Sequence, residues 1–209
     1  DHKLGLEEYK EGTFVMSSKD MCMIEHIPEL MESGIDSFKI EGRMKSAYYA
    51  AVVTNSYRMA IDAYLADPEG YEFDTRIMRE LESVSHREYC TGFYRDFPMD
   101  EPQMSTINGY IREKAYFATA LDESELPLPD SLERTTDGGT LYPFIQRNKI
   151  KLGDSAEMIS PRKLGRAFGV TELYSESGEP IEAAPHPSQK FFVRVPFEVT
   201  AGDIIRSGE

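Results

Sequence analysis

Residues 39–46, Lys-Ile-Glu-Gly-Arg-Met-Lys-Ser, bring together side chains that can transfer protons and bind anions. The Glu41 carboxylate can act as an acid, a base or an orienting group, and the cationic Arg43 and Lys45 can bind a carboxylate or a phosphate. The run lies where a predicted strand ends and a predicted helix begins, and main-chain N–H groups there favour anions. We therefore predict Glu41, Arg43 and Lys45 as catalytic residues. An ion pair of Glu41 with Lys39 or Arg43 in a solvated turn explains the same residues equally well.

Cys22 and Cys90 are the two cysteines of the chain, too few for a disulfide framework or a site built from cysteine pairs. Cys22 lies among apolar neighbours, where a cysteine is usually a small buried hydrophobic residue. As a nucleophile Cys22 would need a base, and His26 is the nearest histidine in the sequence. An iron–sulfur cluster takes about four thiolates, so Cys22 could bind one only with further ligands from elsewhere.

Residues 85–94 mix polar and aromatic side chains after a predicted helix, which suits a loop that faces a substrate. His86 and Arg87 are the predicted substrate-contacting residues of this loop. A packed turn is the alternative, and for Cys90 it is the one that we favour. The sequence contains no complete HExxH, GxSxG, P-loop or GxGxxG motif, so it shows no complete hydrolase site.

The first half of the chain alternates short apolar runs with segments of helical periodicity, a pattern typical of βα units around a parallel sheet. In such sheets, functional groups collect at the C-terminal ends of the strands. Pro28 fits a first helical turn, and Gly34 is placed to end that helix in a left-handed conformation. The predicted elements, in chain order, are a strand over 14–16, a helix over 24–31, a strand over 37–41, a helix over 46–65 and a helix over 75–85.

After about Asn108 the sequence becomes rich in β-branched and aromatic runs separated by glycine and proline turns, which indicates a β-barrel or sandwich. An acidic, proline-bearing stretch over 122–139 is predicted to be a long surface loop. Residues 151–155 and 200–204 both place Gly-Asp between strand-like runs. We prefer two independent hairpin turns to a true repeat as the explanation.

The 209 residues include 37 acidic and 23 basic side chains, for a formal net charge of -14, and 40% are hydrophobic. This composition excludes a disordered or collagen-like chain and fits two small domains, which we predict at 1–107 and 108–209. No apolar run approaches the roughly 20 residues that span a bilayer, and residues 1–10 lack the layout of a signal peptide. The expected compartment is the cytoplasm. Because the first predicted element is a strand without a preceding helix, we expect the C-terminal part of a longer protein.

Six basic residues in the second half are the candidate RNA contacts. Apart from its acidic loop, this half is locally basic within an acidic chain, and binding to phosphate groups requires a basic surface. A commoner explanation for such basic residues is that they keep a solvated edge strand from pairing with another chain. The candidates are Arg147, Lys149 and Lys151 in one cluster and Arg162, Lys163 and Arg166 in another.

Two motifs of the first half, Ser-Ser-Lys-Asp-Met-Cys over 17–22 and Phe-Lys-Ile-Glu-Gly-Arg-Met-Lys-Ser over 38–46, closely resemble the collagenase-like peptidase U32 family. The resemblance implies the last βα units of a TIM-barrel-like catalytic domain, followed by a small β-barrel. It also implies that the N-terminal half of the TIM-like barrel is a missing partner. Further segments that fit the family are 85–87, 91–94, 146–149, 153–154, 184–187 and 202–204.

The resemblance also implies an activity and a cofactor. Members of the family include prephenate-dependent hydroxylases of the tRNA wobble uridine, and several hold a 4Fe-4S cluster ligated by the cysteine of a Ser-Lys-Asp-x-Cys motif. That cysteine is Cys22 here, and the other ligands are expected upstream of Asp1. Prephenate is then the expected co-substrate and tRNA the expected partner.

We therefore favour a fragment of a tRNA wobble-uridine hydroxylase, inactive by itself. Arg43 and Lys45 would bind the carboxylates of a prephenate-like donor or an RNA phosphate. The alternatives are a collagenase-like protease, for which the residues show no nucleophile or metal, and a non-catalytic partner-binding chain. Neither a membrane nor DNA is an expected partner. The net charge of -14 argues against RNA unless the protein has a locally basic face.

Overall fold

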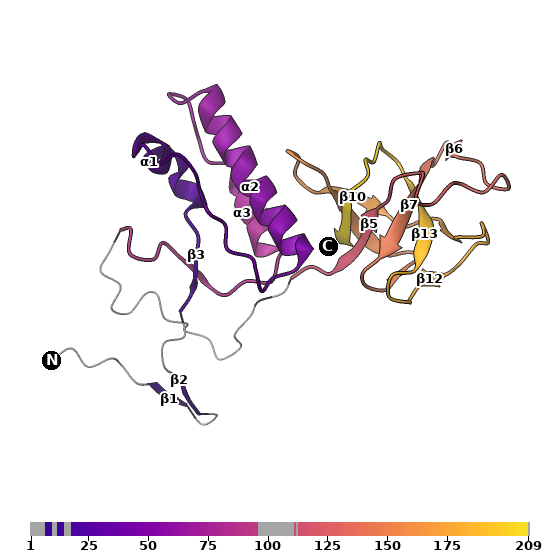
Figure 1. Cartoon of the computed structure of the whole chain (residues 1–209), viewed down its shortest axis with the longest axis horizontal. Helices are drawn as coiled ribbons and strands as arrows, with labels where there is room; N and C mark the ends of the chain where they lie inside the picture. The colour runs from indigo at the N-terminus through magenta and orange to yellow at the C-terminus, as the bar shows by residue number, and fades with distance from the viewer. Residues whose placement is uncertain (1–6, 10–11, 15–17, 96–110, 112, 209) are drawn as a thin grey trace.

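The computed structural model describes residues 7–9, 12–14, 18–95, 111 and 113–208. Helices and short strands form the N-terminal part, and a curled antiparallel sheet forms the C-terminal part (Figure 1). Among the described residues, no helix is long and apolar enough to cross a membrane. The predicted domain boundary after residue 107 lies outside the described residues.

The N-terminal part contains one antiparallel hairpin and one parallel strand pair. Strands β1 and β2 form the hairpin, whereas β3 and β4 pair in parallel across the intervening helices, as expected for a βα arrangement. The predicted TIM-barrel-like organisation remains a prediction. The elements are β1 (Glu7–Tyr9), β2 (Gly12–Phe14), β3 (Asp20–Met21), η1 (Ile24–His26), α1 (Ile27–Glu32), α2 (Ala47–Ala66), α3 (Thr75–Glu82) and β4 (Tyr89–Cys90).

The three predicted helices are confirmed, and local signals explain where they begin and end. The Ser46 hydroxyl accepts the N–H of Tyr49 at the start of α2, and the Asp74 carboxylate does the same for Arg76 at α3. Pro28 lies in the first turn of α1, and Gly34 follows that helix with a φ of 77°. The predicted strand over 14–16 lies mostly outside the described residues.

The predicted strand over 37–41 is wrong, because this segment forms no ladder. A strand needs a neighbour to satisfy its main-chain N–H and C=O groups, and β4 pairs with β3 instead. Ile40 nevertheless packs against the buried residues of the helices. The alternating pattern therefore serves packing of an irregular segment rather than strand pairing.

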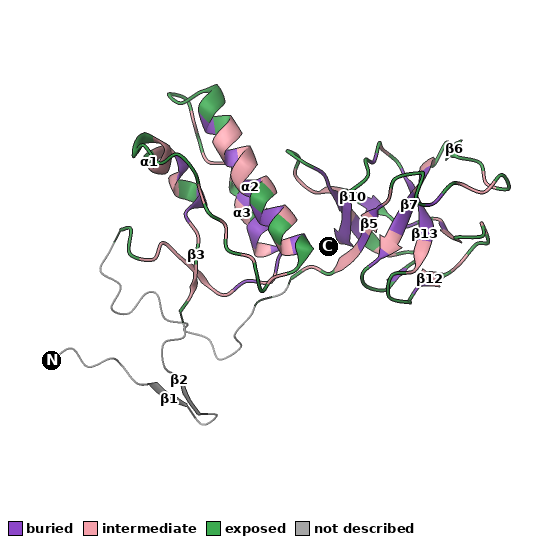
Figure 2. Cartoon of the chain, viewed as in Figure 1, coloured by how far each residue is buried: buried purple, intermediate pink, exposed green. Residues whose placement is uncertain are grey.

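The C-terminal part is an eight-stranded sheet in the order β10-β9-β14-β5-β7-β13-β11, with β6 paired to β7. All of its pairings are antiparallel, and Phe144, Phe191 and Met158 lie fully buried in its core. Figure 2 shows buried residues along these strands and exposed residues in many of the turns. The strands are β5 (Tyr116–Ala120), β6 (Thr135–Thr136), β7 (Gly139–Gln146), β8 (Ile150–Lys151), β9 (Ser155–Ile159), β10 (Arg166–Gly169), β11 (Leu173–Ser175), β12 (Ala183–Ala184), β13 (Lys190–Val195) and β14 (Ile204–Ser207).

The expected closed barrel is only partly formed. Within the described part of the chain, no strand pairing joins β10 to β11, the two ends of the sheet order. Strands β8 and β12 form a separate short ladder. The sheet is therefore strongly curled but open, because its two edge strands are not paired with each other.

The acidic stretch over 122–139 is more ordered than the predicted surface loop. Leu126 is 3% exposed and packs in a small core with Phe192 of β13. The buried Arg194 donates to the main-chain oxygen of Arg134 at 3.2 Å. This segment covers a face of the sheet whose apolar residues would otherwise meet water.

The two Gly-Asp segments form the same turn. The Asp154 carboxylate accepts the N–H of Lys151 at 2.9 Å, and the Asp203 carboxylate accepts the N–H of Thr200 at 3.0 Å. In both turns the preceding glycine has a positive φ, which glycine adopts without strain. A shared turn type accounts for the similarity of the two segments.

The helices and the sheet share one core. Ile159 of β9 and Ile204 of β14 belong to the same buried cluster as Val52 and Leu81 of the helices. A buried arginine reinforces this contact, since Arg206 forms ion pairs with Glu80 of α3 at 2.7 Å and with Glu157 of β9 at 2.6 Å. The two parts are therefore joined by packing and by charge.

Candidate functional site

The parallel pair β3–β4 brings the two cysteines of the chain to adjoining strand ends. Met21 is in register with Cys90, and the N–H of Cys22 donates to the carbonyl oxygen of Cys90 at 2.9 Å. Cys22 thus lies directly after the C-terminal end of β3. This is where functional side chains collect in parallel sheets.

Cys22 is half-buried, and its side-chain partner is a tyrosine. The Tyr57 hydroxyl donates to Cys22 Sγ at 3.9 Å and accepts the N–H of Met23 at 3.0 Å. Burial raises the pKa of the Cys22 thiol, and hydrogen bonds from Ile24 N–H and Tyr57 offset only part of this effect. The thiol is therefore poorly prepared to act as a free thiolate nucleophile.

His26 does not serve as the base for Cys22 in this arrangement. Its Nδ1 lies 3.1 Å from the Glu29 carboxylate and 2.8 Å from Nη2 of Arg95. These contacts bind the histidine to α1 and to the segment after β4. The structure thus gives no support to the cysteine–histidine pair that a thiol protease would use.

Lys45 joins two sites that the sequence predicted separately. Its ammonium donates to the carbonyl oxygen of Ser85 at 2.9 Å and lies 3.8 Å from the Asp20 carboxylate. The same carboxylate accepts the main-chain N–H of Arg87 at 2.9 Å. Lys45 is therefore held against the predicted substrate loop by Asp20, which the sequence did not single out.

His86 is buried in that loop and is firmly oriented. Its Nδ1 donates to the carbonyl oxygen of Arg87 at 2.6 Å, and its ring stacks on Tyr89 with centroids 4.4 Å apart. The Nε2 atom has no hydrogen-bond partner in the described structure. His86 is placed as a rigid part of the loop rather than as an exposed contact.

Glu41 and Arg43 lie apart from this cluster of contacts. Both are exposed, and the Glu41 carboxylate accepts the main-chain N–H of Arg43 at 3.0 Å. Glu41 therefore stabilises its own turn. The catalytic roles of Glu41, Arg43 and Lys45 stay predictions.

The two basic clusters differ in their surroundings. Arg147, Lys149 and Lys151 are exposed around the β7–β8 turn, and Lys151 lies 4.0 Å from Asp154. In the second cluster, Arg162 and Lys163 lie in the β9–β10 turn beside α2, and Arg166 is the first residue of β10.

Sequence reasoning missed two residues of the Cys22 surroundings, Asp20 and Tyr57. Asp20 lies in the same short motif as Cys22 and could have been found by that proximity. Tyr57 is 35 residues from Cys22 along the chain. Only the packing of α2 against β3 reveals Tyr57 as a partner of the thiol.

The described residues do not form a complete metal site. They contain no group of three or more His, Cys, Asp or Glu side chains placed to hold a metal ion. A 4Fe-4S cluster uses about four thiolates, and the chain has two cysteines. Cys22 could therefore be one ligand among several, with the remaining donors supplied from outside the described residues.

The chain consists of two parts: helices around a parallel strand pair that has Cys22 and Cys90 at its C-terminal ends, and a curled antiparallel sheet. Two family models match these two parts: Peptidase family U32 over residues 2–104 and Peptidase family U32 C-terminal domain over residues 132–206. The chain belongs to peptidase family U32.

Curated relatives carry two kinds of name. The tRNA hydroxylation protein P1 of Bacillus subtilis is 34% identical over 200 residues, which cover 96% of this chain and 44% of that protein. An uncharacterized protease of Methanocaldococcus jannaschii is 54% identical over 100 residues, which cover 47% of this chain and 24% of that protein. The chain thus spans less than half the length of either relative.

A solved structure also resembles part of the chain. The C-terminal domain of a Geobacillus thermoleovorans protein assigned to the U32 peptidases aligns with a TM-score of 0.36 and 20% identity. The alignment covers 45% of this chain and 92% of that domain.

Proposed function

We propose that this chain is part of an enzyme that hydroxylates the wobble uridine of tRNA, with prephenate as co-substrate and a 4Fe-4S cluster as cofactor. The observation that carries this proposal is the 34% identity to a tRNA hydroxylation protein over 96% of the chain. That similarity extends through both the helical part and the sheet. The similarity to the archaeal protease-named protein covers 47% of the chain.

Cys22 is the proposed cluster ligand from this chain. It follows a strand end, and its partly buried thiol is shielded from bulk water, as suits a ligand of an oxidation-sensitive cluster. Such a cluster would supply electron-transfer chemistry. Because burial raises the thiol pKa, ligation requires the iron to displace a proton that the thiol otherwise keeps.

Lys45 is the proposed anion-binding residue beside the cluster ligand. Main-chain oxygen and carboxylate contacts hold its ammonium between the β3 end and the predicted substrate loop. From there it can bind a carboxylate of a prephenate-like donor. Arg43 is exposed nearby in sequence and is proposed as the second anion-binding residue.

The test compares cysteine variants of the protein in its full natural length. Wild type, Cys22→Ala and Cys90→Ala are purified without oxygen and analysed for iron, acid-labile sulfide and absorption. Each variant is also expressed in a bacterium that lacks its own tRNA hydroxylation protein, and tRNA nucleosides are analysed by mass spectrometry. We expect Cys22→Ala to lose both the iron and the hydroxylated uridine, and the matched Cys90→Ala to keep both.

Iron that persists in Cys22→Ala would refute the ligand assignment. A wild-type protein that restores no hydroxylated nucleoside, but cleaves a peptide substrate, would instead favour the protease alternative. The 209-residue chain by itself is expected to be inactive, because its two cysteines cannot complete the cluster.

A further inference from the structure

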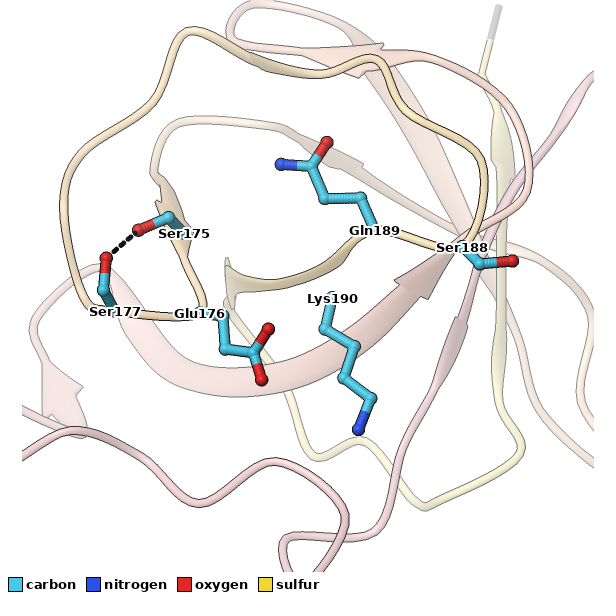
Figure 3. A pocket seen from close by; sticks show the side chains of 6 residues that line it. All are labelled: Ser175, Glu176, Ser177, Ser188, Gln189 and Lys190. Atoms are coloured by element: carbon cyan, nitrogen blue, oxygen red, sulfur yellow. Dashed lines mark hydrogen bonds between the residues drawn. The ribbon is translucent and has the colours of Figure 1, made fainter.

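A polar hollow of about 660 Å³ lies between the end of β11 and the start of β13 (Figure 3). It contains hydroxyl, amide and ammonium groups, the kinds that contact phosphate and sugar oxygens in nucleic acid complexes. In Figure 3 the Ser188 side chain points away from those of the other five residues, and a dashed line joins Ser175 to Ser177, whose hydroxyl oxygens are 2.9 Å apart. The lining residues, called the serine groove below, are Ser175, Glu176, Ser177, Ser188, Gln189 and Lys190.

The serine groove adjoins the first basic cluster. The N–H of Gln146 donates to the carbonyl oxygen of Gln189 at 2.9 Å, and the N–H of Ser188 donates to the carbonyl oxygen of Gln146 at 3.2 Å. The next residue after Gln146 is Arg147, which is exposed together with Lys149. Two exposed cationic residues thus follow a strand end whose main chain is bonded to two residues of the hollow.

The groove is held in a fixed shape. Ser188 has a φ of 60°, a left-handed conformation that costs a residue other than glycine some energy, and Arg162 of the second basic cluster has the same φ. The Lys190 ammonium donates to the main-chain oxygen of Glu125 at 2.8 Å. That contact is with a neutral carbonyl, and Lys190 forms no ion pair among the described residues. Glu176 is the single carboxylate of the groove lining.

Two side chains of the second basic cluster, Arg162 and Arg166, have contacts within the protein. Arg162 Nε lies 3.5 Å from the Asp62 carboxylate, and Arg166 lies over the Phe197 ring at 3.9 Å. The Asn55 side chain accepts the N–H of Arg162 at 2.6 Å, which fixes the turn against α2. These contacts give the second cluster a structural role at the junction of the helices and the sheet.

On the basis of the proposed tRNA function, we infer that the serine groove and the adjoining Arg147 and Lys149 bind the sugar–phosphate backbone of the RNA substrate, and that the second basic cluster does not. Arg147, Lys149 and Lys190 attract the phosphates, while the serine hydroxyls and Gln189 bind phosphate and ribose oxygens. The groove lacks aromatic side chains for base stacking, so this contact is with the backbone and does not read the sequence.

The first experiment measures binding of the purified chain to a tRNA transcribed in vitro, at salt concentrations from 50 to 300 mM. We expect Arg147→Ala/Lys149→Ala to weaken binding by about tenfold at low salt and to lower the slope of log affinity against log salt by about 1 to 2. Arg76→Ala/Arg79→Ala removes the same charge from an exposed part of α3 and should leave the slope unchanged. Arg162→Ala/Lys163→Ala compares the two basic clusters directly and should have the smaller effect.

The second experiment changes the charge of the groove in the opposite direction. Glu176→Gln removes the carboxylate from the lining and should tighten tRNA binding by about two- to threefold, because it removes repulsion of the phosphates. Glu69→Gln, at an exposed position after α2, makes the same charge change and should have no such effect. Thermal unfolding of each variant checks that the fold is retained.

The outcomes separate the inference from the function on which it depends. Wild-type chain that binds tRNA equally well after loss of Arg147 and Lys149 would contradict the groove assignment alone. A larger loss from Arg162→Ala/Lys163→Ala would assign the RNA contact to the second cluster and overturn the inference. Wild-type chain that does not bind tRNA would contradict its contribution to RNA binding and thereby weaken the proposed function itself.

Discussion

At the scale of single residues, Tyr57 is the side chain that links the strand end at Cys22 to helix α2. Its hydroxyl satisfies the N–H of the buried Met23 and donates to the Cys22 thiol. Burial also raises the pKa of Tyr57 above its usual value, so the hydroxyl keeps its proton and remains a donor. The geometry of Cys22 therefore depends on a residue distant in the sequence.

Replacing this hydroxyl tests that dependence. Tyr57→Phe leaves the N–H of Met23 without a partner in a buried place, and we expect the free energy of unfolding to fall by about 1–2 kcal/mol. The thiol also loses a hydrogen bond that lowers its pKa, so alkylation of Cys22 by iodoacetamide at pH 8 should slow. Urea unfolding and peptide mass spectrometry measure the two effects. Tyr94→Phe, at an exposed position, is the control, and equal behaviour of the two variants would contradict the prediction.

At the scale of elements, a buried charge network fastens the sheet to the helices. Arg206 of β14 is 2% exposed and contacts Glu80 of α3, Glu157 of β9 and the Ser83 hydroxyl. Lys114 also donates to Glu157, at 2.6 Å. Two cations and two carboxylates therefore balance one another where water is largely excluded.

Breaking this network should be costly. Arg206→Met leaves Glu80 and Glu157 buried without their arginine, and we expect a loss of about 3–5 kcal/mol in the free energy of unfolding. Arg76→Met, which removes an exposed ion pair with Asp74, should cost at most about 1 kcal/mol. Urea unfolding followed by circular dichroism measures both variants. Similar costs for the two would mean that the buried network adds nothing beyond a surface pair.

The same network makes the free energy of unfolding depend on pH. Burial alone raises the pKa of the Glu157 carboxyl, but contacts with Lys114 and Arg206 outweigh burial and hold it below its ordinary value of 4.5. A lowered folded pKa contributes stability above about pH 4.5 that is lost as the pH falls through the folded value. Glu157→Gln should therefore lose less stability than wild type when the pH is lowered from about 5 to 3.

At the scale of the whole molecule, the helical part and the sheet are expected to unfold together. Their shared buried cluster includes Ile159 and Ile204 from the sheet, and Asn55 of α2 bonds to the carbonyl oxygens of Ser160 and Lys163. Separation of the two parts would expose this apolar surface and the charges around Arg206. The buried cluster that the two parts build together would then be broken.

Amide hydrogen exchange measures this coupling directly, and the absence of tryptophan makes fluorescence a poor substitute. We expect the most protected amides of α2 and β13 to open with the same free energy, because both exchange only on global unfolding. In the Arg206→Met variant, we expect the opening free energies of α2 and β13 to differ from each other. Different values in the wild-type chain would show that the parts are independent.

Much of the local structure followed from the sequence. Helical periodicity, Pro28 and Gly34 identified the helices, because these signals act over a few residues. The change to β-branched and aromatic runs identified the antiparallel sheet. The strand that Cys22 follows, Asp20–Met21, was not predicted, because two residues carry too short a pattern to be recognised.

Only the tertiary structure decided which residues meet. The alternating segment over 37–41 lacks a strand because no neighbour pairs with it, and Lys45 meets Ser85 because β3 and β4 lie side by side. The acidic loop packs through Leu126, and Arg206 lies buried among carboxylates. The sequence around Leu126 and around Arg206 does not indicate either contact. Strand pairing and buried charge balance depend on contacts between distant residues, which periodicity and caps do not encode.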